Sequence, residues 1–138
     1  MACSKPVYET LPAWQEGMLD IHCISTGMGN ATYIIMPDGT TMLVDMGQMG
    51  DTTRYLPHPG KTPAQWVARY IETFSTGLPH PGRLDYFFLT HFHSDHMGMG
   101  YMAYPGEHGY RLNGITELGE YLSFNEIVDR GYPAYDYP

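Results

Sequence analysis

Residues 84–98 read LDYFFLTHFHSDHMG, an apolar run followed at once by four potential metal ligands. The run Leu84–Leu89 has the length and apolar character of a buried β-strand. Because side chains alternate between the two faces of a strand, His91 and His93 are expected on the same side where the strand ends, facing one ion. The chain then turns, so Asp95 and His96 can both point at a second, neighbouring ion. The spacing therefore predicts a strand that delivers ligands to two metals.

These ligand types indicate both the ion and the reaction. Neutral imidazole and carboxylate are natural ligands for Zn²⁺, and they also suit manganese and iron. Two ions about 3.5–4 Å apart share an activated water molecule and clamp the oxygens of an ester or phosphate. Asp95 can in addition orient that water or carry its proton. A scatter of unrelated exposed histidines is a poor alternative, because four ligand-type side chains occupy six positions. We expect a metal-dependent hydrolase.

A β-hairpin and a helix are predicted upstream. The runs Thr32–Met36 and Thr41–Val44 flank PDGT, in which proline fixes one turn dihedral and glycine permits positive φ. Thr62 begins a helix signature, with proline next and a glutamine at the capping-box position. Apolar residues follow at helical spacing, so this helix should cover one face of the sheet: Trp66, Val67, Tyr70, Ile71 and Phe74. The intervening residues, 46–61, are predicted to form a long loop that borders the mouth of the site.

Three short elements are predicted after the motif. Met97–Tyr104 and Ile115–Leu122 have the composition of short helices, and Glu126–Asp129 is typical of a strand. Glu117 and Glu120 could be imagined as an acid–base pair. The exposed face of a helix is the better explanation for both carboxylates.

Two of these stretches resemble the metallo-beta-lactamase superfamily. Its signature, His-x-His-x-Asp-His at the end of a strand, matches His91, His93, Asp95 and His96 without a gap. Residues 25–47 are similar to the early hairpin of that family, which ends in Asp-x-Gly. The details Gly-x-Gly-x-Ala and Pro-Asp-Gly-x-x-x-Leu-x-Asp within these residues are most similar to the lactamase-like domain of bacterial late-competence DNA-uptake proteins.

The resemblance implies an αββα sandwich with a dinuclear site. The first two histidines would hold one ion, and the aspartate and the last histidine would hold the other, as the spacing also predicts. Asp45 would brace the metal loop without binding an ion, which is compatible with simple capping of local backbone amides. The implied reaction is hydrolysis of an ester, amide, lactam or phosphodiester, and the likeness to DNA-uptake proteins favours a phosphodiester.

Length sets a limit on this resemblance. A sandwich commonly needs about 200–250 residues as one unit, whereas this chain has 138. The family places a third histidine, a bridging aspartate and a final histidine well after the signature, and nothing after Gly98 offers that series. His108 follows too closely, and His22, His58 and His80 precede the signature and are expected to be ordinary residues. We expect residues 1–138 to be one truncated domain, the N-terminal half of the sandwich, incomplete as an enzyme.

A half sandwich would leave one apolar face of its sheet uncovered, so self-association is expected. Two other classes of function stay open. The chain could be a non-catalytic metal-binding or assembly module, or a di-iron electron-transfer member of the same superfamily. In the hydrolase interpretation, the partner is a small-molecule or phosphodiester substrate.

The composition of the chain bears on whether it binds nucleic acid or a membrane. Fifteen acidic against seven basic residues give a formal charge of −8, which opposes a broad electrostatic grip on nucleic acid. No apolar stretch approaches the roughly 20 residues that span a bilayer, and the first residues have no hydrophobic signal core. A cytoplasmic location is expected, or the cell envelope if a leader was removed. Cys3 and Cys23 belong to no paired metal motif.

Overall fold

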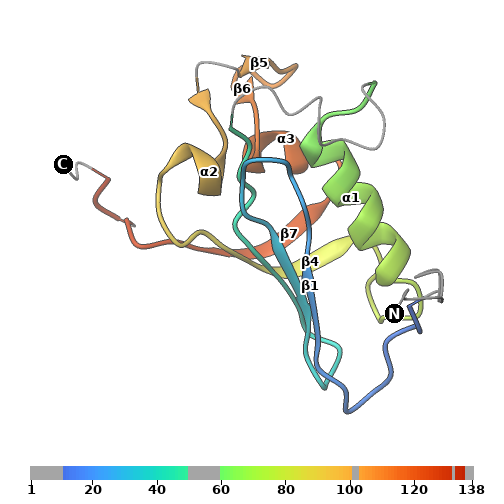
Figure 1. Ribbon diagram of the computed structural model, residues 1–138. Coiled ribbons are helices and arrows are strands. Elements are labelled where there is room, and N and C mark those ends of the chain that lie inside the picture. The colour runs from blue at the N-terminus through green and yellow to red at the C-terminus, as the bar shows by residue number, and fades with distance from the viewer. Residues whose placement is uncertain (1–10, 50–59, 101–102, 132, 136–138) are drawn as a thin grey trace, which may run out of the picture.

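The computed structural model describes residues 11–49, 60–100, 103–131 and 133–135. Cys3, His58 and most of the predicted 46–61 loop lie outside these residues. Five strands form one mixed sheet in the order β1-β2-β3-β4-β7, and β5 pairs with β6 in a separate small sheet (Figure 1). The fold is therefore mixed α/β. In chain order the elements are β1 (Asp20–Cys23), β2 (Thr32–Ile35), β3 (Thr41–Val44), α1 (Pro63–Phe74), β4 (Arg83–Phe88), α2 (Ser94–Met97), β5 (Tyr104–Pro105), β6 (Arg111–Leu112), α3 (Ile115–Leu118) and β7 (Ser123–Val128).

The predicted hairpin is formed by β2 and β3. The two strands pair antiparallel, from Thr32 opposite Val44 to Ile35 opposite Thr41. Gly39 turns the chain at a φ of 85°, a left-handed conformation that glycine adopts without steric cost. β1 adds to the outer edge of β2. It was not predicted, because it is only four residues long and alternates half-buried polar residues with exposed Ile21 and Cys23.

The parallel strands β3, β4 and β7 decide where the site lies. β4 runs parallel to β3, with Val44 level with Phe88, and β7 runs parallel to β4, with Phe88 level with Val128. Parallel neighbours end at the same edge of a sheet. Asp45 and the residues that follow β4 therefore meet at one edge, although they are far apart in the sequence.

α1 covers one face of this sheet, as its periodicity predicts (Figure 1). The capping box is present: Thr62 Oγ1 accepts a hydrogen bond from the Gln65 amide at 3.2 Å, and Gln65 Oε1 accepts one from the Thr62 amide at 3.1 Å. Buried residues of the helix pack in one core with buried strand residues, among them Val67, Ile71, Tyr33, Ile35, Leu43 and Phe87. This packing fixes the sheet that carries the site.

The other face of the sheet is apolar and partly exposed. Ile34, Met42 and Val44 alternate with the buried residues of β2 and β3, so they face away from α1. The register adds Phe88 from β4 and Val128 from β7 to the same face, with 38% and 39% of their surface exposed. This set of five side chains is called the open face below.

Three predictions about the region after β4 need correction. Where a short helix was expected over Met97–Tyr104, the described residues instead place α2 at Ser94–Met97, inside the motif, and α2 ends where Gly98 takes a φ of 100°. Residues 101 and 102 of the predicted helix lie outside the described residues. The helix expected over Ile115–Leu122 ends at Leu118, and the strand expected from Glu126 begins at Ser123. Within the described part of this region, the helices are therefore shorter than the sequence predicts, and the last strand is longer.

The prediction that Glu117 lies on the exposed face of a helix is wrong. Its side chain is fully buried, not on an exposed helix face. Glu117 Oε1 accepts a hydrogen bond of 2.5 Å from the hydroxyl of Thr62, the cap residue of α1. Glu120 is exposed, as expected, and accepts a hydrogen bond from the Tyr110 hydroxyl. In the described ranges, no helix combines the length and the apolar character that crossing a bilayer requires.

Candidate metal centre

The motif begins as β4 leaves the sheet. Leu89 still donates its amide to the Val128 carbonyl at 2.9 Å, and the regular ladder ends there. His93 then precedes α2 as its cap residue, and its carbonyl accepts the amides of His96 and Met97. One helical turn places Ser94 and Met97, three residues apart, on one side of α2. Asp95 and His96 consequently lie on the opposite side.

The structure brings three of the four predicted ligands together. His91, Asp95 and His96 each offer an atom within 4.8 Å of the other two. The Nε2 atom of His96 lies 3.4 Å from Asp95 Oδ2, and the rings of His91 and His96 have centroids 3.9 Å apart. All three side chains are half-buried.

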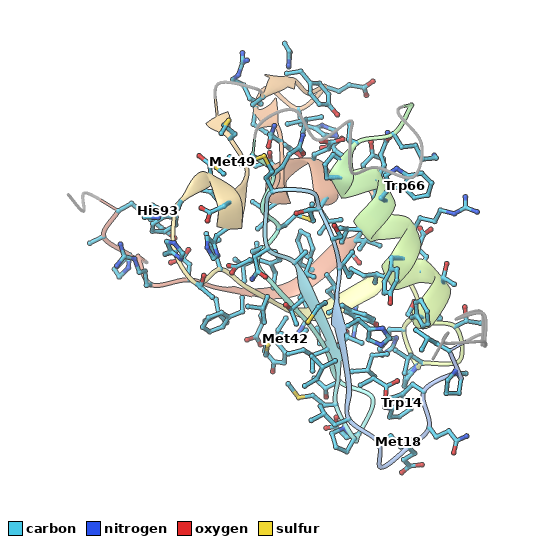
Figure 2. All side chains as sticks on the ribbon, viewed as in Figure 1. Trp14, Met18, Met42, Met49, Trp66 and His93 are labelled. Atoms are coloured by element: carbon cyan, nitrogen blue, oxygen red, sulfur yellow. The ribbon has the colours of Figure 1, made fainter. Side chains whose placement is uncertain are left out.

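His93 lies beside this group but outside it. Its ring centroid is 4.6 Å from that of His91, and the residue is exposed. Figure 2 shows His93 at the periphery of the molecule, next to the start of α2. The division of ligands into His91 with His93 and Asp95 with His96 stays a prediction, because the described group instead joins His91 to the other pair.

Asp45 is the buried anchor of the group. Its side chain has no exposed surface, and its backbone has a φ of 62°, uncommon for a residue other than glycine. Asp45 Oδ1 accepts hydrogen bonds from the amide and hydroxyl of Thr90 at 2.8 Å and 3.0 Å. Asp45 Oδ2 accepts from Asn30 Nδ2 at 3.1 Å and from His96 Nδ1 at 2.7 Å. The residue thus caps the backbone amide of Thr90, which is not local in the sequence, and also holds a ligand histidine.

The environment of Asp45 keeps it ionised. Burial alone raises the pKa of this carboxyl group, but hydrogen bonds from His96, Thr90 and Asn30 outweigh burial and hold the pKa below its ordinary value. An ionised carboxylate can only accept hydrogen bonds. The groups around Asp45 must therefore all be donors.

This requirement decides that Nδ1 carries a proton in both His91 and His96. The Thr90 hydroxyl donates to Asp45, so its oxygen accepts from His91 Nδ1, which lies 3.0 Å away. His96 Nδ1 donates to Asp45 directly. With Nδ1 protonated on both rings, each histidine keeps the Nε2 lone pair that a metal ion needs.

The donor set fits a metal ion. In the tautomer of neutral His96 that carries its proton on Nδ1, the Nε2 atom and the carboxylate of Asp95 are both acceptors, and they face each other at 3.4 Å. Two acceptors repel unless a proton or a cation lies between them. Ligands about 2.0–2.2 Å from a shared Zn²⁺ lie at most roughly 4.4 Å apart, which is close to the spread of this group.

Backbone contacts from the residues just before β2 and just after β3 hold α2 in place. The amides of Asn30 and Met46 donate to the carbonyls of Asp95 and His96, both at 2.8 Å. Gly47 makes this approach possible, since a Cβ atom there would lie 1.7 Å from the Asp95 carbonyl oxygen. The Asp-x-Gly sequence at 45–47 therefore supplies both the anchoring carboxylate and the close backbone contact.

Sequence reasoning did not identify Thr90 or Asn30 as site residues. The position of Thr90, immediately before the first histidine, was the available signal for it. Asn30 is brought to Asp45 by the β2–β3 pairing, and no local pattern indicates this contact.

Comparisons of the whole chain with protein-family models, with curated proteins and with solved structures found no match. The functional interpretation therefore depends on the signature and on the geometry described above.

Proposed function

We propose that this chain carries the metal site of a metal-dependent hydrolase of the metallo-beta-lactamase type, with Zn²⁺ as the ion. The observation that carries the proposal is the group of His91, Asp95 and His96 with Asp45 behind it. Manganese and iron are the alternative ions for such ligands. In this proposal residues 1–138 correspond to the N-terminal half of an αββα sandwich, a view supported by the helix on one sheet face and the apolar open face on the other.

In the proposed site each residue has a separate task. With two ions, His91 and His93 would hold one and Asp95 and His96 the other. With a single ion, His91 would join Asp95 and His96 in holding it. A bound Zn²⁺ would supply Lewis acidity and lower the pKa of a water molecule toward neutrality. Asp45 and Thr90 would hold the Nδ1 atoms of the two braced histidines, so that the neutral rings present Nε2 to the ion. The second carboxylate oxygen of Asp95 would orient the attacking water or accept its proton.

The substrate proposed is an ester, lactam or phosphodiester. The charge of −8 disfavours a broad contact with nucleic acid. Cations at the site would reverse the sign of the local potential and attract an anionic phosphodiester. A small phosphodiester is therefore the first substrate class to test.

One observation supports a second candidate, a non-catalytic metal-binding module. The described residues gather three ligands rather than four, and three ligands can hold a single ion without the dinuclear arrangement. A di-iron electron-transfer protein is the remaining alternative from the signature. Bound iron with a reversible change in visible absorption would identify that alternative, and bound zinc would not.

The test is hydrolysis of bis(4-nitrophenyl) phosphate by the zinc-loaded chain. Because residues 1–138 do not offer the later ligands of the family, we expect only slow release of nitrophenol. This release should stop when the metal is chelated, return when Zn²⁺ is added back, and be lost in Asp95→Asn. His80→Ala is the matched control, because His80 is exposed and precedes β4, whereas the motif follows its end. Metal binding without any hydrolysis would favour the non-catalytic module. Hydrolysis that survives Asp95→Asn would contradict the proposed site.

A further inference from the structure

A pocket of about 420 Å³ lies on the side of α2 opposite the ligand group. Ser94 and Met97, which share one side of α2, line it together with Phe92 from the motif. Its volume falls within the roughly 300–1,000 Å³ of typical small-molecule pockets. The pocket is therefore large enough for a ligand, and it does not include the candidate metal ligands.

The walls of this pocket are mostly apolar, with a few polar side chains among them. Phe92, Met97, Ala103 and Ile115 supply the apolar wall. Asn113 is one of the polar lining residues. Its Oδ1 accepts a hydrogen bond from the Met99 amide at 3.0 Å, so its NH₂ group is the part left to donate to a ligand. A site of this kind suits a ligand with an apolar body and one polar end.

Among the described residues that line the pocket, Arg111 is the only charged one. Its guanidinium contacts the carbonyl of Ala103. Among the described residues, no carboxylate forms an ion pair with Arg111, whereas Arg83 is paired with Asp85 at 3.0 Å. A guanidinium without a carboxylate partner favours a carboxylate or phosphate from a ligand. In a chain of charge −8, this local positive charge selects the anionic end of that ligand.

We propose that the pocket binds a small carboxylate with an aryl or short alkyl body. The carboxylate pairs with Arg111 and accepts from the Asn113 amide group, while the apolar body contacts Phe92, Met97 and Ile115. Binding requires no metal, because α2 separates the pocket from Asp95 and His96. The proposal therefore stands or fails independently of the hydrolase proposal.

The test measures binding of 4-phenylbutyrate to the full chain by calorimetry, with a chelator present so that no metal can bind the carboxylate. The uncharged 4-phenylbutanamide has the same apolar body and serves as the matched ligand. We expect the carboxylate to bind more tightly than the amide. Arg111→Met should weaken binding of the carboxylate by about tenfold, since a charge-assisted hydrogen bond is lost, and should leave binding of the amide unchanged.

Two further variants separate the pocket from the rest of the surface. Lys61→Met removes one positive charge from an exposed residue outside the pocket and should leave binding unchanged. Gly100→Trp should block the pocket for both ligands. A Cβ atom at Gly100 meets nothing within 4 Å, so the substitution is compatible with folding, which circular dichroism would verify. Equal binding of acid and amide, equal effects of the Arg111 and Lys61 variants, or no binding at millimolar carboxylate would overturn the proposal.

Discussion

Substituting Gly47 by alanine is predicted to damage both the stability of the fold and the candidate metal centre. A Cβ atom at Gly47 would lie 1.7 Å from the Asp95 carbonyl oxygen, and real Cβ contacts essentially never fall below 3.0 Å. The carbonyl must therefore retreat by about 1.3 Å, the gap between these two distances. The Asn30 amide, 2.8 Å from that oxygen and 2.9 Å from the added Cβ, would lose its hydrogen bond.

The magnitude follows from these contacts. A lost backbone hydrogen bond costs about 1 kcal/mol, and forced overpacking costs about 1–3 kcal/mol. We expect the free energy of unfolding to fall by about 2–4 kcal/mol in Gly47→Ala. Because Asp95 moves with its carbonyl, zinc affinity should fall as well, since ligand geometry must be kept within a few tenths of an ångström.

Urea unfolding followed by circular dichroism, and zinc titration of the folded protein, measure the two effects. Gly100→Ala is the matched control, because its added Cβ meets no atom within 4 Å. This control should change the free energy of unfolding by less than about 1 kcal/mol. A Gly47→Ala protein as stable as the control, with wild-type zinc affinity, would refute the inference that the close backbone contact at Gly47 holds α2 in place.

Three other predictions concern separate parts of the chain. Asp45→Asn should lower zinc affinity by about 10–100-fold, because it weakens the hold on His96, whereas the exposed Asp38→Asn should not; equal zinc titrations of the two variants would argue against the anchoring role. Burial lowers the pKa of His22 from 6.5. The unfolded chain thus binds the proton more tightly, so this contribution to stability is complete above pH 6.5 and shrinks as the pH falls below it. As the pH is lowered, the urea midpoint of His22→Phe should therefore fall less steeply than that of the wild type. Parallel pH profiles of the two proteins would contradict this. Phe88→Ser on the open face should reduce the self-association proposed for that face, as seen by sedimentation velocity, while Met28→Ser at another exposed position should not; an unchanged sedimentation profile in Phe88→Ser would speak against this interface.

The parts of the fold that were predicted from sequence are those with strong local signals. The capping box at Thr62 and the turn at Gly39 act within a few residues, so they can be recognised without a structure. The strand before the motif could likewise be recognised locally, from the largely apolar run Leu84–Leu89. β1 was missed because Ile21 is exposed and its strand is held by pairing with β2.

The details of the site depend on contacts between distant residues. Strand alternation predicts that His91 and His93 act together, but the regular ladder ends at Leu89, before either histidine. Their positions are then decided by the turn and by Asp45, which lies 51 residues from His96. The burial of Glu117 has the same origin, because its partner Thr62 is 55 residues away. The bracing role of Asp45 was expected only through the resemblance of the Asp-x-Gly sequence, and no local pattern indicated the contact between Glu117 and Thr62.

The central claim is that His91, Asp95 and His96 form a metal site, and metal content per chain tests it most directly. The measurement is plasma mass spectrometry on zinc-loaded, desalted wild-type protein, on Asp95→Asn and on the control His80→Ala. The account predicts about one equivalent of zinc if the three ligands hold a single ion and about two if His93 completes a second site. The control should retain this amount and Asp95→Asn should lose most of it. Wild-type protein that retains no metal, or an Asp95→Asn variant that retains as much as the control, would contradict the account.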